Sequence, residues 1–428
     1  IIGAGLAGVE AAYQLASRGI PVKLYEMKKH KKSPAHTSDD FAELVCSNSL
    51  RSNDLHNAVG LLKEEMRRLN SIVMSVADKV SVPAGSALAV DRIQFSKELT
   101  SLIRSHPLIT VIDEEVTELP STPTIIATGP LTSEALFNSL QKLTCEDYLY
   151  FFDAAAPIVT FESIDMTKAY FKSRYDKGEP TYINCPMTKE EYDIWYEQLL
   201  KAECVIPHDF ELKLFEGCMP FEEMARRGEH TLRYGPLKPV GLEKEKGKRP
   251  YAVVQLRQDN QEGTLYNIVG FQTHLTFPEQ RKIIRLIPGL ENAEIVRYGV
   301  MHRNSFVNAP RVLNRYYQMK DHPNYFIAGQ LSGVEGYVES AGSGLIAGIQ
   351  MARYLSNKPF IEFPQTTALG AQSLYFETSD VATFQPMNIN FGLFLPLDKA
   401  TTKKDKKSAF VERSLEKINE IKERDLID

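Results

Sequence analysis

The sequence is poor in cysteine, and it lacks both a long apolar run and a charged leader followed by an apolar stretch. No segment approaches the roughly 20 apolar residues that a membrane-spanning helix needs. The five cysteines are odd in number and widely spaced, which predicts neither a disulfide framework nor a zinc site. We therefore expect a cytoplasmic protein without a membrane partner and without a metal. The cysteines are Cys46, Cys145, Cys185, Cys204 and Cys218.

An excess of basic charge is absent as well, since the formal net charge is −5. Nucleic-acid binding usually depends on a basic surface, so any such contact has to come from local patches. Three basic runs are long enough to reach phosphates, although runs of this kind are also typical of solvated faces. We assign no specific role to these runs, which are Lys28–Lys32, Arg226–Arg227 and Lys244–Arg249.

The chain opens on a glycine fingerprint, IIGAGLAG. In this spacing Gly3 permits a tight turn from strand to helix, Gly5 lets the backbone approach a pyrophosphate, and Gly8 lets the helix pack on the strand. A helical stretch follows, and then a strand that ends in Glu26, where a carboxylate would bind a ribose hydroxyl. The series predicts a Rossmann-type nucleotide site rather than an isolated glycine turn.

A length of 428 residues exceeds one ordinary core, so we expect two domains or one large domain with an insertion. Two predicted strands, 124–129 and 325–330, end in Ala-Thr-Gly and Ala-Gly-Gln, a pattern typical of flavoprotein dinucleotide domains. The first and last thirds of the chain are therefore predicted to form one domain. Small residues then open a helix that runs to about Leu355 and can approach a flavin closely. Candidate cofactor contacts in these segments are Gly129, Gly329, Gln330, Gly336, Tyr337 and Gly342.

The middle of the chain has a different character and contains the only tryptophan, Trp195. A helix is predicted at Lys189–Ala202, and two strands, Tyr251–Arg257 and Tyr266–Gln272, are predicted to pair across a polar turn. We therefore predict an α/β fold, with a Rossmann-like domain at 1–155 that resumes at 315–428, and an inserted α+β domain at 156–314. The last segment, from Lys403, is predicted to be a charged helix.

Two cysteines have unusual surroundings. Cys46 lies among small polar residues in LVCSNSLRS, in a loop of the glycine-fingerprint domain that could expose its thiol toward the cofactor. Cys218 lies in EGCMP, where glycine and proline hold it in a turn of the inserted domain. From the residues alone, a buried small side chain remains the ordinary interpretation of each cysteine.

At this point the sequence resembles one family closely, the folate- and FAD-dependent tRNA uridine-5-methyltransferases, often called TrmFO. The resemblance covers essentially the whole chain. It implies a glutathione-reductase-type FAD-binding domain and an enzyme in which 5,10-methylenetetrahydrofolate supplies the carbon, reduced FAD carries it, and NADH or NADPH regenerates the reduced flavin. The segments that carry the resemblance are LVCSNSLRS, DAAAPI, KSRYDKGE, EGCMP, GPLKPVGLE, YAVVQLRQDN, YNIVGFQTHL, VRYGVMHRN, GVEGYVES and FQPMNINFG.

The resemblance also implies roles for the two cysteines. C5 of uracil is a poor nucleophile until another nucleophile adds to C6, and a thiolate is suited to that addition. Cys218 would be this nucleophile, and Cys46 would lie near the flavin and remove the C5 proton. Because Cys218 belongs to the inserted domain, we also expect domain closure or an RNA-induced shift.

A folate has to stack on the flavin, and flat aromatic contacts with polar anchors suit such a pocket. Tyr337 is the best-placed candidate for contact with the folate. His302, Arg303 and Asn304 are further candidates, although these residues could equally have a structural role and hold a loop at the end of a strand. The expected substrate is the T-loop uridine of tRNA. Two alternatives stay open, namely the same chemistry on large-subunit ribosomal RNA and a non-catalytic RNA-binding flavoprotein. The related GidA family modifies the wobble uridine and is longer, so it fits less well.

Overall fold

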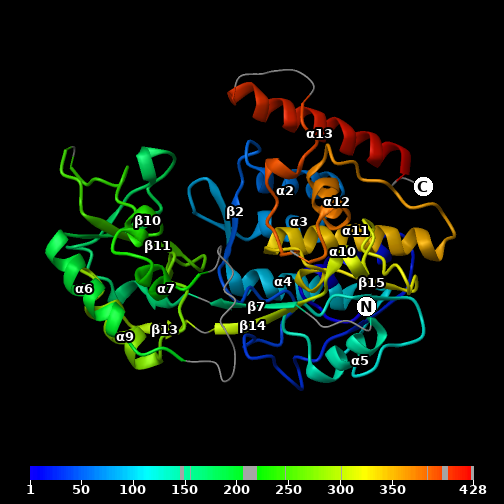
Figure 1. Ribbon diagram of the computed structural model, residues 1–428, viewed down its shortest axis with the longest axis horizontal. Helices are drawn as coiled ribbons and strands as arrows, with labels where there is room; N and C mark the ends of the chain where they lie inside the picture. The colour runs from blue at the N-terminus through cyan, green and yellow to red at the C-terminus, as the bar shows by residue number, and fades with distance from the viewer. Residues whose placement is uncertain are drawn as a thin grey trace.

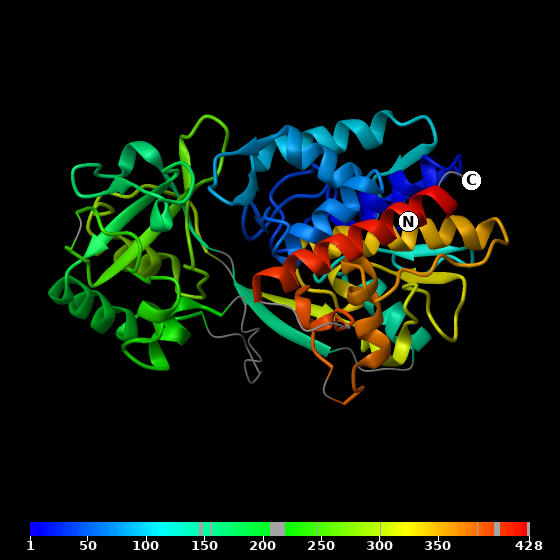
Figure 2. The same cartoon turned by 90° about the horizontal axis from the view of Figure 1, so that it is seen from above.

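Two hydrophobic cores divide the molecule. The computed structural model describes residues 1–144, 149–154, 156–205, 219–245, 247–299, 301–382, 384–397 and 403–425. One core gathers buried residues from 2–140 and 306–421, and the other gathers buried residues from 156–293. The two cores form separate lobes, with the middle of the chain in its own lobe (Figures 1 and 2). Residues 306–313, assigned above to the inserted domain, pack in the first core.

A parallel sheet lies at the centre of the first lobe. Strand β1 (Val22–Tyr25) pairs with β5 (Ile109–Ile112), and β6 (Thr124–Ile126) pairs with β15 (Tyr325–Ile327). Ile2 bridges both Tyr25 and Ile126 in parallel, so the start of the chain joins the two pairs into one layer. Strands from the first and last thirds of the chain therefore lie in the same layer.

Two helices pack tightly beside this sheet, α1 (Leu6–Ala16) and α11 (Tyr337–Leu355). A Cβ atom at Gly344 would lie 2.2 Å from the carbonyl oxygen of Ala7, so this contact between the helices requires glycine. The other elements of the lobe are β2 (Ser49–Ser52), α2 (Ala58–Arg68), α3 (Ile72–Lys79), β3 (Ser81–Val82), β4 (Ala87–Val90), α4 (Arg92–Ser105), α5 (Glu134–Thr144), α10 (Ala309–Val312), α12 (Ala368–Thr378) and α13 (Lys403–Asp425).

The second lobe is built on a six-stranded sheet in the order β13-β8-β12-β11-β10-β9, with antiparallel pairs throughout. Trp195 is fully buried and donates a hydrogen bond from its indole nitrogen to the carbonyl oxygen of Ile283, 3.1 Å away, which joins the two long helices of the lobe. The elements are β8 (Ile158–Thr160), β9 (Tyr170–Phe171), β10 (Tyr182–Met187), α6 (Lys189–Lys201), α7 (Phe221–Arg226), α8 (Thr231–Tyr234), β11 (Ala252–Gln258), β12 (Leu265–Ile268), α9 (Phe277–Arg285) and β13 (Ile295–Arg297).

The lobes are connected by an antiparallel ribbon of β7 (Leu149–Ala154) and β14 (Met301–Phe306), which runs between them in Figure 1. The predicted strand at 266–272 ends earlier, at Ile268, because the chain turns at Gly270, where φ is +79°. Within the described residues, no helix is long and apolar enough to cross a membrane.

Candidate cofactor and cysteine site

A cavity with about 1080 Å³ of empty space opens at the carboxyl ends of the parallel strands. Seven of the predicted site residues line it, together with Val45, the neighbour of Cys46. In open α/β sheets, ligands bind in the crevice at this edge. The seven are Gly3, Gly5, Glu26, Gly129, Gly329, Gln330 and Tyr337.

The three glycines of the fingerprint have distinct environments. Gly3 adopts a φ of +95°, and a Cβ there would lie 2.6 Å from the carbonyl oxygen of Ala127. A Cβ at Gly8 would lie 1.8 Å from the carbonyl oxygen of Gly3, so this position is fixed by close packing rather than by ligand contact. Gly5 has nothing within 4 Å of its would-be Cβ, and it caps α1 without a side-chain hydrogen bond. The uncapped helix start facing open space fits a dinucleotide phosphate.

Glu26 lies at the end of β1, as the fingerprint predicts for a ribose-binding carboxylate. Its Oε2 accepts a hydrogen bond from the backbone nitrogen of Ala4 at 2.8 Å, and its Oε1 accepts one from that of Lys28 at 3.0 Å. These bonds fix the carboxylate in the cavity wall. Each carboxylate oxygen can accept a further bond, which suits a ribose hydroxyl.

Like Gly8, two further predicted glycines, Gly336 and Gly342, lie outside the cavity lining. Gly336 precedes α11 with a φ of +107°, and a Cβ there would lie 2.3 Å from the Glu339 carboxylate. A Cβ at Gly342 would lie 3.2 Å from the side chain of Leu369, so this glycine serves the packing of α11 on α12. Both position the helix that carries Tyr337. Gln330 lines the cavity, and its amide nitrogen donates to Glu335 at 2.7 Å.

Tyr337 connects the cavity to the segment that carries Cys46. Its phenolic oxygen accepts hydrogen bonds from the backbone nitrogens of Cys46, at 2.7 Å, and Ser47, at 3.4 Å. Burial raises the pKa of the Tyr337 phenol, and the neighbouring Cys46 contributes in the same direction. The phenol is therefore neutral at physiological pH and can hold this loop by its oxygen while its ring lines the cavity.

The inserted domain also reaches the Cys46 segment. Arg257, at the end of β11, donates to the Ser47 hydroxyl at 2.5 Å and to Oδ1 of Asn48 at 3.1 Å. Asn48 is fully buried, and its amide nitrogen donates back to the carbonyl oxygen of Gln258 at 2.8 Å. The two residues that follow Cys46 thus depend on the placement of the other lobe.

A buried ion pair adds to this contact between the lobes. Arg92 contacts Asp259 at 2.9 Å and also donates to the carbonyl oxygen of Leu44 at 2.7 Å. Arg297 donates to the carbonyl oxygen of Val45 at 2.7 Å. Burial disfavours the charged form of Arg92, but Asp259, together with Tyr337 and Cys46, outweighs burial and raises the pKa of this guanidinium. The local sequence pattern does not indicate a role for these arginines, although Arg257 and Asp259 stand in the segment YAVVQLRQDN.

The other residues that the sequence singled out lie away from the cavity or outside the described part of the chain. Cys218 and Cys145 lie outside the described residues. His302, Arg303 and Asn304 lie within β14, opposite Asp153, Phe152 and Phe151 of β7, and Asn304 is buried. Asn304 is not part of the cavity lining. Cys185 is fully buried in β10, and burial raises the pKa of its thiol, which fits a core residue.

The three basic runs carry paired charges. In the first run, Lys29 contacts Asp113 at 3.3 Å and Lys31 contacts Glu115 at 2.7 Å. In the other two, Arg226 contacts Glu223 at 2.6 Å and Arg249 contacts Glu243 at 2.8 Å. These partners reduce the positive potential that each run could offer to RNA phosphates.

Comparisons with known proteins agree with this arrangement. The family model described as "Glucose inhibited division protein A" matches residues 1–359. A protein named methylenetetrahydrofolate–tRNA-(uracil-5-)-methyltransferase TrmFO, from Anoxybacillus flavithermus, is 62% identical over 421 residues, which cover 98% of each chain. The protein of the same name from Bacillus subtilis is 60% identical over 424 residues, again 98% of each chain.

Solved structures show the same architecture. Two crystal forms of Aquifex aeolicus GidA superpose with TM-scores of 0.70 and 0.71 at 15% identity. Each superposition covers 98% of this chain, together with 72% of the GidA chain in one crystal form and 75% in the other. The predicted fold, a Rossmann-like FAD-binding domain with an insertion, is therefore confirmed.

Proposed function

This chain belongs to the glucose-inhibited division protein A family, and from its close identity to the TrmFO enzymes we propose that it is a methylenetetrahydrofolate–tRNA-(uracil-5-)-methyltransferase. The single observation that carries the proposal is the identity of about 60% over nearly the full length of both relatives. The reaction forms 5-methyluridine in tRNA. We propose the T-loop uridine as the position and the cytoplasm as the location.

The cavity at the glycine fingerprint fits FAD. The uncapped start of α1 would hold the pyrophosphate, and Glu26 would hold the ribose. When bound, FAD supplies the reducing equivalents and carries the methylene group from methylenetetrahydrofolate, with NADH or NADPH as the reductant. Tyr337 lines the same cavity and offers an aromatic face for the flavin or the folate.

The chain's own residues would handle the uracil ring. We propose that the Cys218 thiolate adds to C6, so that a carbon–sulfur bond forms and the C5–C6 double-bond electrons move to an enolate. C5 then takes the methylene carbon, and Cys46 removes the C5 proton as a base. That carbon has to part from its carrier and gain a hydride, for which the reduced flavin would supply the two electrons, so that it becomes the methyl group as release of the Cys218 thiolate restores the C5–C6 double bond. Two hydrogen bonds support this role of Cys46: Tyr337 accepts one from the Cys46 backbone nitrogen, and Arg257 donates one to the neighbouring Ser47 hydroxyl.

A single-turnover assay tests the proposal. FAD-loaded protein is mixed with NADPH, labelled methylenetetrahydrofolate and either unmodified tRNA or ribosomal RNA, and the assay is repeated with Cys218→Ala. Label on tRNA that disappears in the variant supports the proposal. Label on ribosomal RNA alone would change the substrate, and label on neither RNA would refute the methyltransferase.

A further inference from the structure

An exposed aromatic pair lies on the inserted domain, where helix α9 meets the chain that follows β13 (Figure 1). The rings of Phe277 and Tyr298 stack with their centroids 4.6 Å apart and an angle of 24° between their planes. Phe277 is 51% exposed, and Tyr298 is half-buried. Single exposed apolar residues are ordinary, but a stacked pair of rings open to solvent marks a candidate binding surface.

Two arginines continue this surface along α9. Phe277, Arg281 and Arg285 are spaced four residues apart, so they lie on one face of the helix, and all three are exposed. A guanidinium nitrogen of Arg281 donates to the Tyr298 hydroxyl at 2.6 Å, and the guanidinium carbon lies 5.9 Å from the centre of that ring. We call these four residues, Phe277, Tyr298, Arg281 and Arg285, the aromatic–arginine face.

The arginines of this face keep their positive charge available to a ligand. Arg281 donates to the Tyr298 hydroxyl, and Arg285 donates to the carbonyl oxygen of Ala293 at 3.2 and 3.1 Å. Among the residues that the structure describes, neither arginine forms an ion pair with a carboxylate. The three basic runs differ, because residues in each of them contact acidic partners. The face can therefore attract phosphate groups although the chain has a net charge of −5.

The aromatic–arginine face is tied to the wall of the cofactor cavity. Arg297, which immediately precedes Tyr298, donates to the carbonyl oxygen of Val45 at 2.7 Å, and Val45 lines the cavity. After Tyr298, the backbone of Gly299 and the side chain of Gln280 exchange two hydrogen bonds of 2.8 Å, which fix this chain to α9. The face is therefore held one residue away from a contact with the cavity wall.

Open aromatic rings beside arginines are suited to single-stranded RNA. Every nucleobase has a flat face that can stack on a phenylalanine or tyrosine ring, and neighbouring arginines can bind the phosphates that flank the base. A second copy of this chain fits the face less well. A two-fold dimer interface places the same patch of both subunits together, which would bring like charges face to face. The charges thus favour an anionic partner.

We propose that the aromatic–arginine face binds an unpaired base of the RNA substrate next to the target uridine. The open side of the Phe277–Tyr298 pair would stack on the base, and Arg281 and Arg285 would contact phosphates. The inference rests on the proposed function for the identity of the RNA. Enzymes that modify a base reach it in a single-stranded or flipped-out form, so the adjacent bases lose a stacking partner. An aromatic surface tied to the cavity wall replaces that partner.

Fluorescence of 2-aminopurine tests the stacking directly, because the emission of this base falls when it stacks on an aromatic ring. The probe is unmodified tRNA that carries 2-aminopurine at single T-loop positions on either side of the target uridine, mixed with the full FAD-loaded chain. Phe277→Leu and Tyr298→Leu each remove a ring but keep an apolar side chain, whereas Phe277→Tyr keeps the ring. Tyr234→Leu, which removes an 80% exposed tyrosine from α8 of the same domain, is the matched control.

We expect at least one T-loop probe to lose emission on the wild-type protein, and this loss to shrink by at least about half in both leucine variants. The Kd for tRNA should rise by at least about fivefold in these variants and stay within about twofold of the wild type in Phe277→Tyr and Tyr234→Leu. Unchanged emission and Kd in both leucine variants would overturn the proposal.

The variant Arg281→Gln separates the charge from the stacking. Glutamine can still bond to the Tyr298 hydroxyl, but it lacks the charge, so the slope of log Kd against log salt concentration should become shallower by about one. Phe277→Leu should keep the wild-type slope. Lys201→Gln, which removes an exposed charge from α6, should keep it as well. An unchanged slope in Arg281→Gln would overturn the phosphate contact.

The folding of each variant can be followed in the same samples. The indole of Trp195 donates to the carbonyl oxygen of Ile283 on α9, so the melting midpoint of its fluorescence reports whether this helix is intact. If a leucine variant does not fold, the slope of Arg281→Gln decides the proposal, since this exposed residue is replaced without loss of a buried group.

The outcomes also separate this inference from the proposed function. Wild-type protein that methylates tRNA, with the same Kd and emission in every variant, would overturn the aromatic–arginine face alone. Wild-type protein that methylates no RNA would refute the proposed function, while Kd and emission with the same tRNA would still decide the face. A wild-type dimer in sedimentation equilibrium that dissociates in Phe277→Leu would assign the face to a second copy of the chain and overturn the proposal.

Discussion

The phenolic oxygen of Tyr337 lies 2.7 Å from the backbone nitrogen of Cys46, although the two residues are far apart in the chain. This contact joins the start of α11 to the loop that carries a candidate base. Because Tyr337 and Val45 both line the cavity, the same contact places the Cys46 loop beside the cavity. One phenol therefore joins the cavity wall to the backbone of Cys46.

Tyr337→Phe is expected to slow methylation by at least about tenfold, because it removes the acceptor of the Cys46 amide and loosens the loop. FAD should stay bound, since the aromatic ring remains. Single-turnover methylation and the flavin absorption spectrum measure the two effects. Tyr354→Phe, which removes a hydroxyl on the same helix that contacts Asn324, is the control. Equal rates for both variants would contradict this role of Tyr337.

Arg257→Lys tests the contact between the lobes. A lysine cannot reproduce the two hydrogen bonds that Arg257 makes to Ser47 and Asn48, since an ammonium lacks the planar fork. We expect release of tritium from C5 of labelled uridine, the proposed Cys46 step, to slow by about tenfold. Covalent capture of tRNA that contains 5-fluorouridine reports the thiol step, because fluorine at C5 cannot leave as a proton does, and it should change less.

The control for Arg257→Lys is Arg249→Lys, which alters an exposed pair with Glu243 in the same domain. Both rates should stay at the wild-type value in that variant. If Arg257→Lys slowed capture and tritium release equally, the arginine would act on the position of the whole lobe rather than on the Cys46 loop.

Two glycine substitutions separate packing from ligand contact. Gly8→Ala should prevent folding of the first lobe, because the new methyl group would lie 1.8 Å from the carbonyl oxygen of Gly3. Gly5→Ala should fold with an unchanged melting temperature without FAD, since nothing lies within 4 Å of its Cβ position. Its FAD affinity should fall by at least about tenfold, because the methyl group occupies the phosphate approach. Unchanged FAD affinity in Gly5→Ala would place the phosphates elsewhere.

The sequence predicted the parts of the site that depend on local spacing. The glycine fingerprint, the acid at Glu26 and the small residues before α11 act over a few residues, so their pattern is visible in one chain. The contacts of Arg257 with Asn48 join positions 209 residues apart, and nothing in the local pattern of either segment indicates the other. Gly342 was assigned to the cofactor because small residues serve both close ligand approach and helix packing, and only the position of Leu369 distinguishes them.

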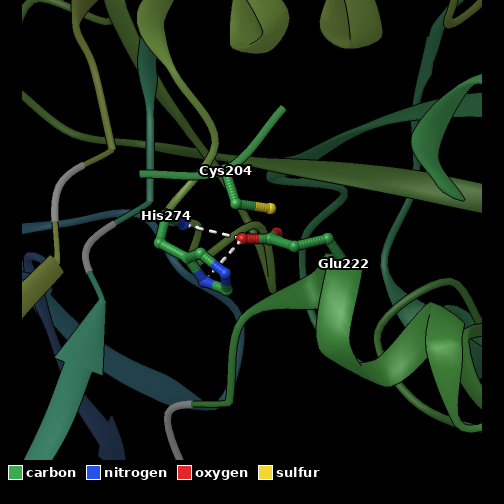
Figure 3. Close-up of side chains that lie close together, drawn as sticks. All are labelled: Cys204, Glu222 and His274. Atoms are coloured by element: carbon green, nitrogen blue, oxygen red, sulfur yellow. Dashed lines mark hydrogen bonds and ion pairs between the residues drawn. The ribbon is translucent and has the colours of Figure 1, made fainter. Parts of the chain in front are cut away.

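Glu222 and His274 form a buried pair in the inserted domain, in which a carboxylate oxygen lies 2.9 Å from Nδ1 of the imidazole (Figure 3). Burial opposes protonation of His274, but the neighbouring Cys204 and Glu222 outweigh it and raise the pKa of the imidazole from its ordinary value of 6.5 to about 10. The pair's contribution to stability is therefore fully present below about pH 6.5 and is lost as the pH rises through about 10.

Trp195 is the only tryptophan and is buried in the same lobe, so its fluorescence reports unfolding of that lobe alone. We expect its melting temperature to fall by several degrees between pH 7 and pH 10 in the wild type. In Glu222→Gln the midpoint should be lower at pH 7 and should fall less over this range, because the neighbouring Cys204 still favours the imidazolium. Asp193→Asn, which removes an exposed ion pair with Lys189 on α6, should follow the wild type. A wild-type midpoint that stays constant to pH 10 would show that His274 is already neutral in the folded protein.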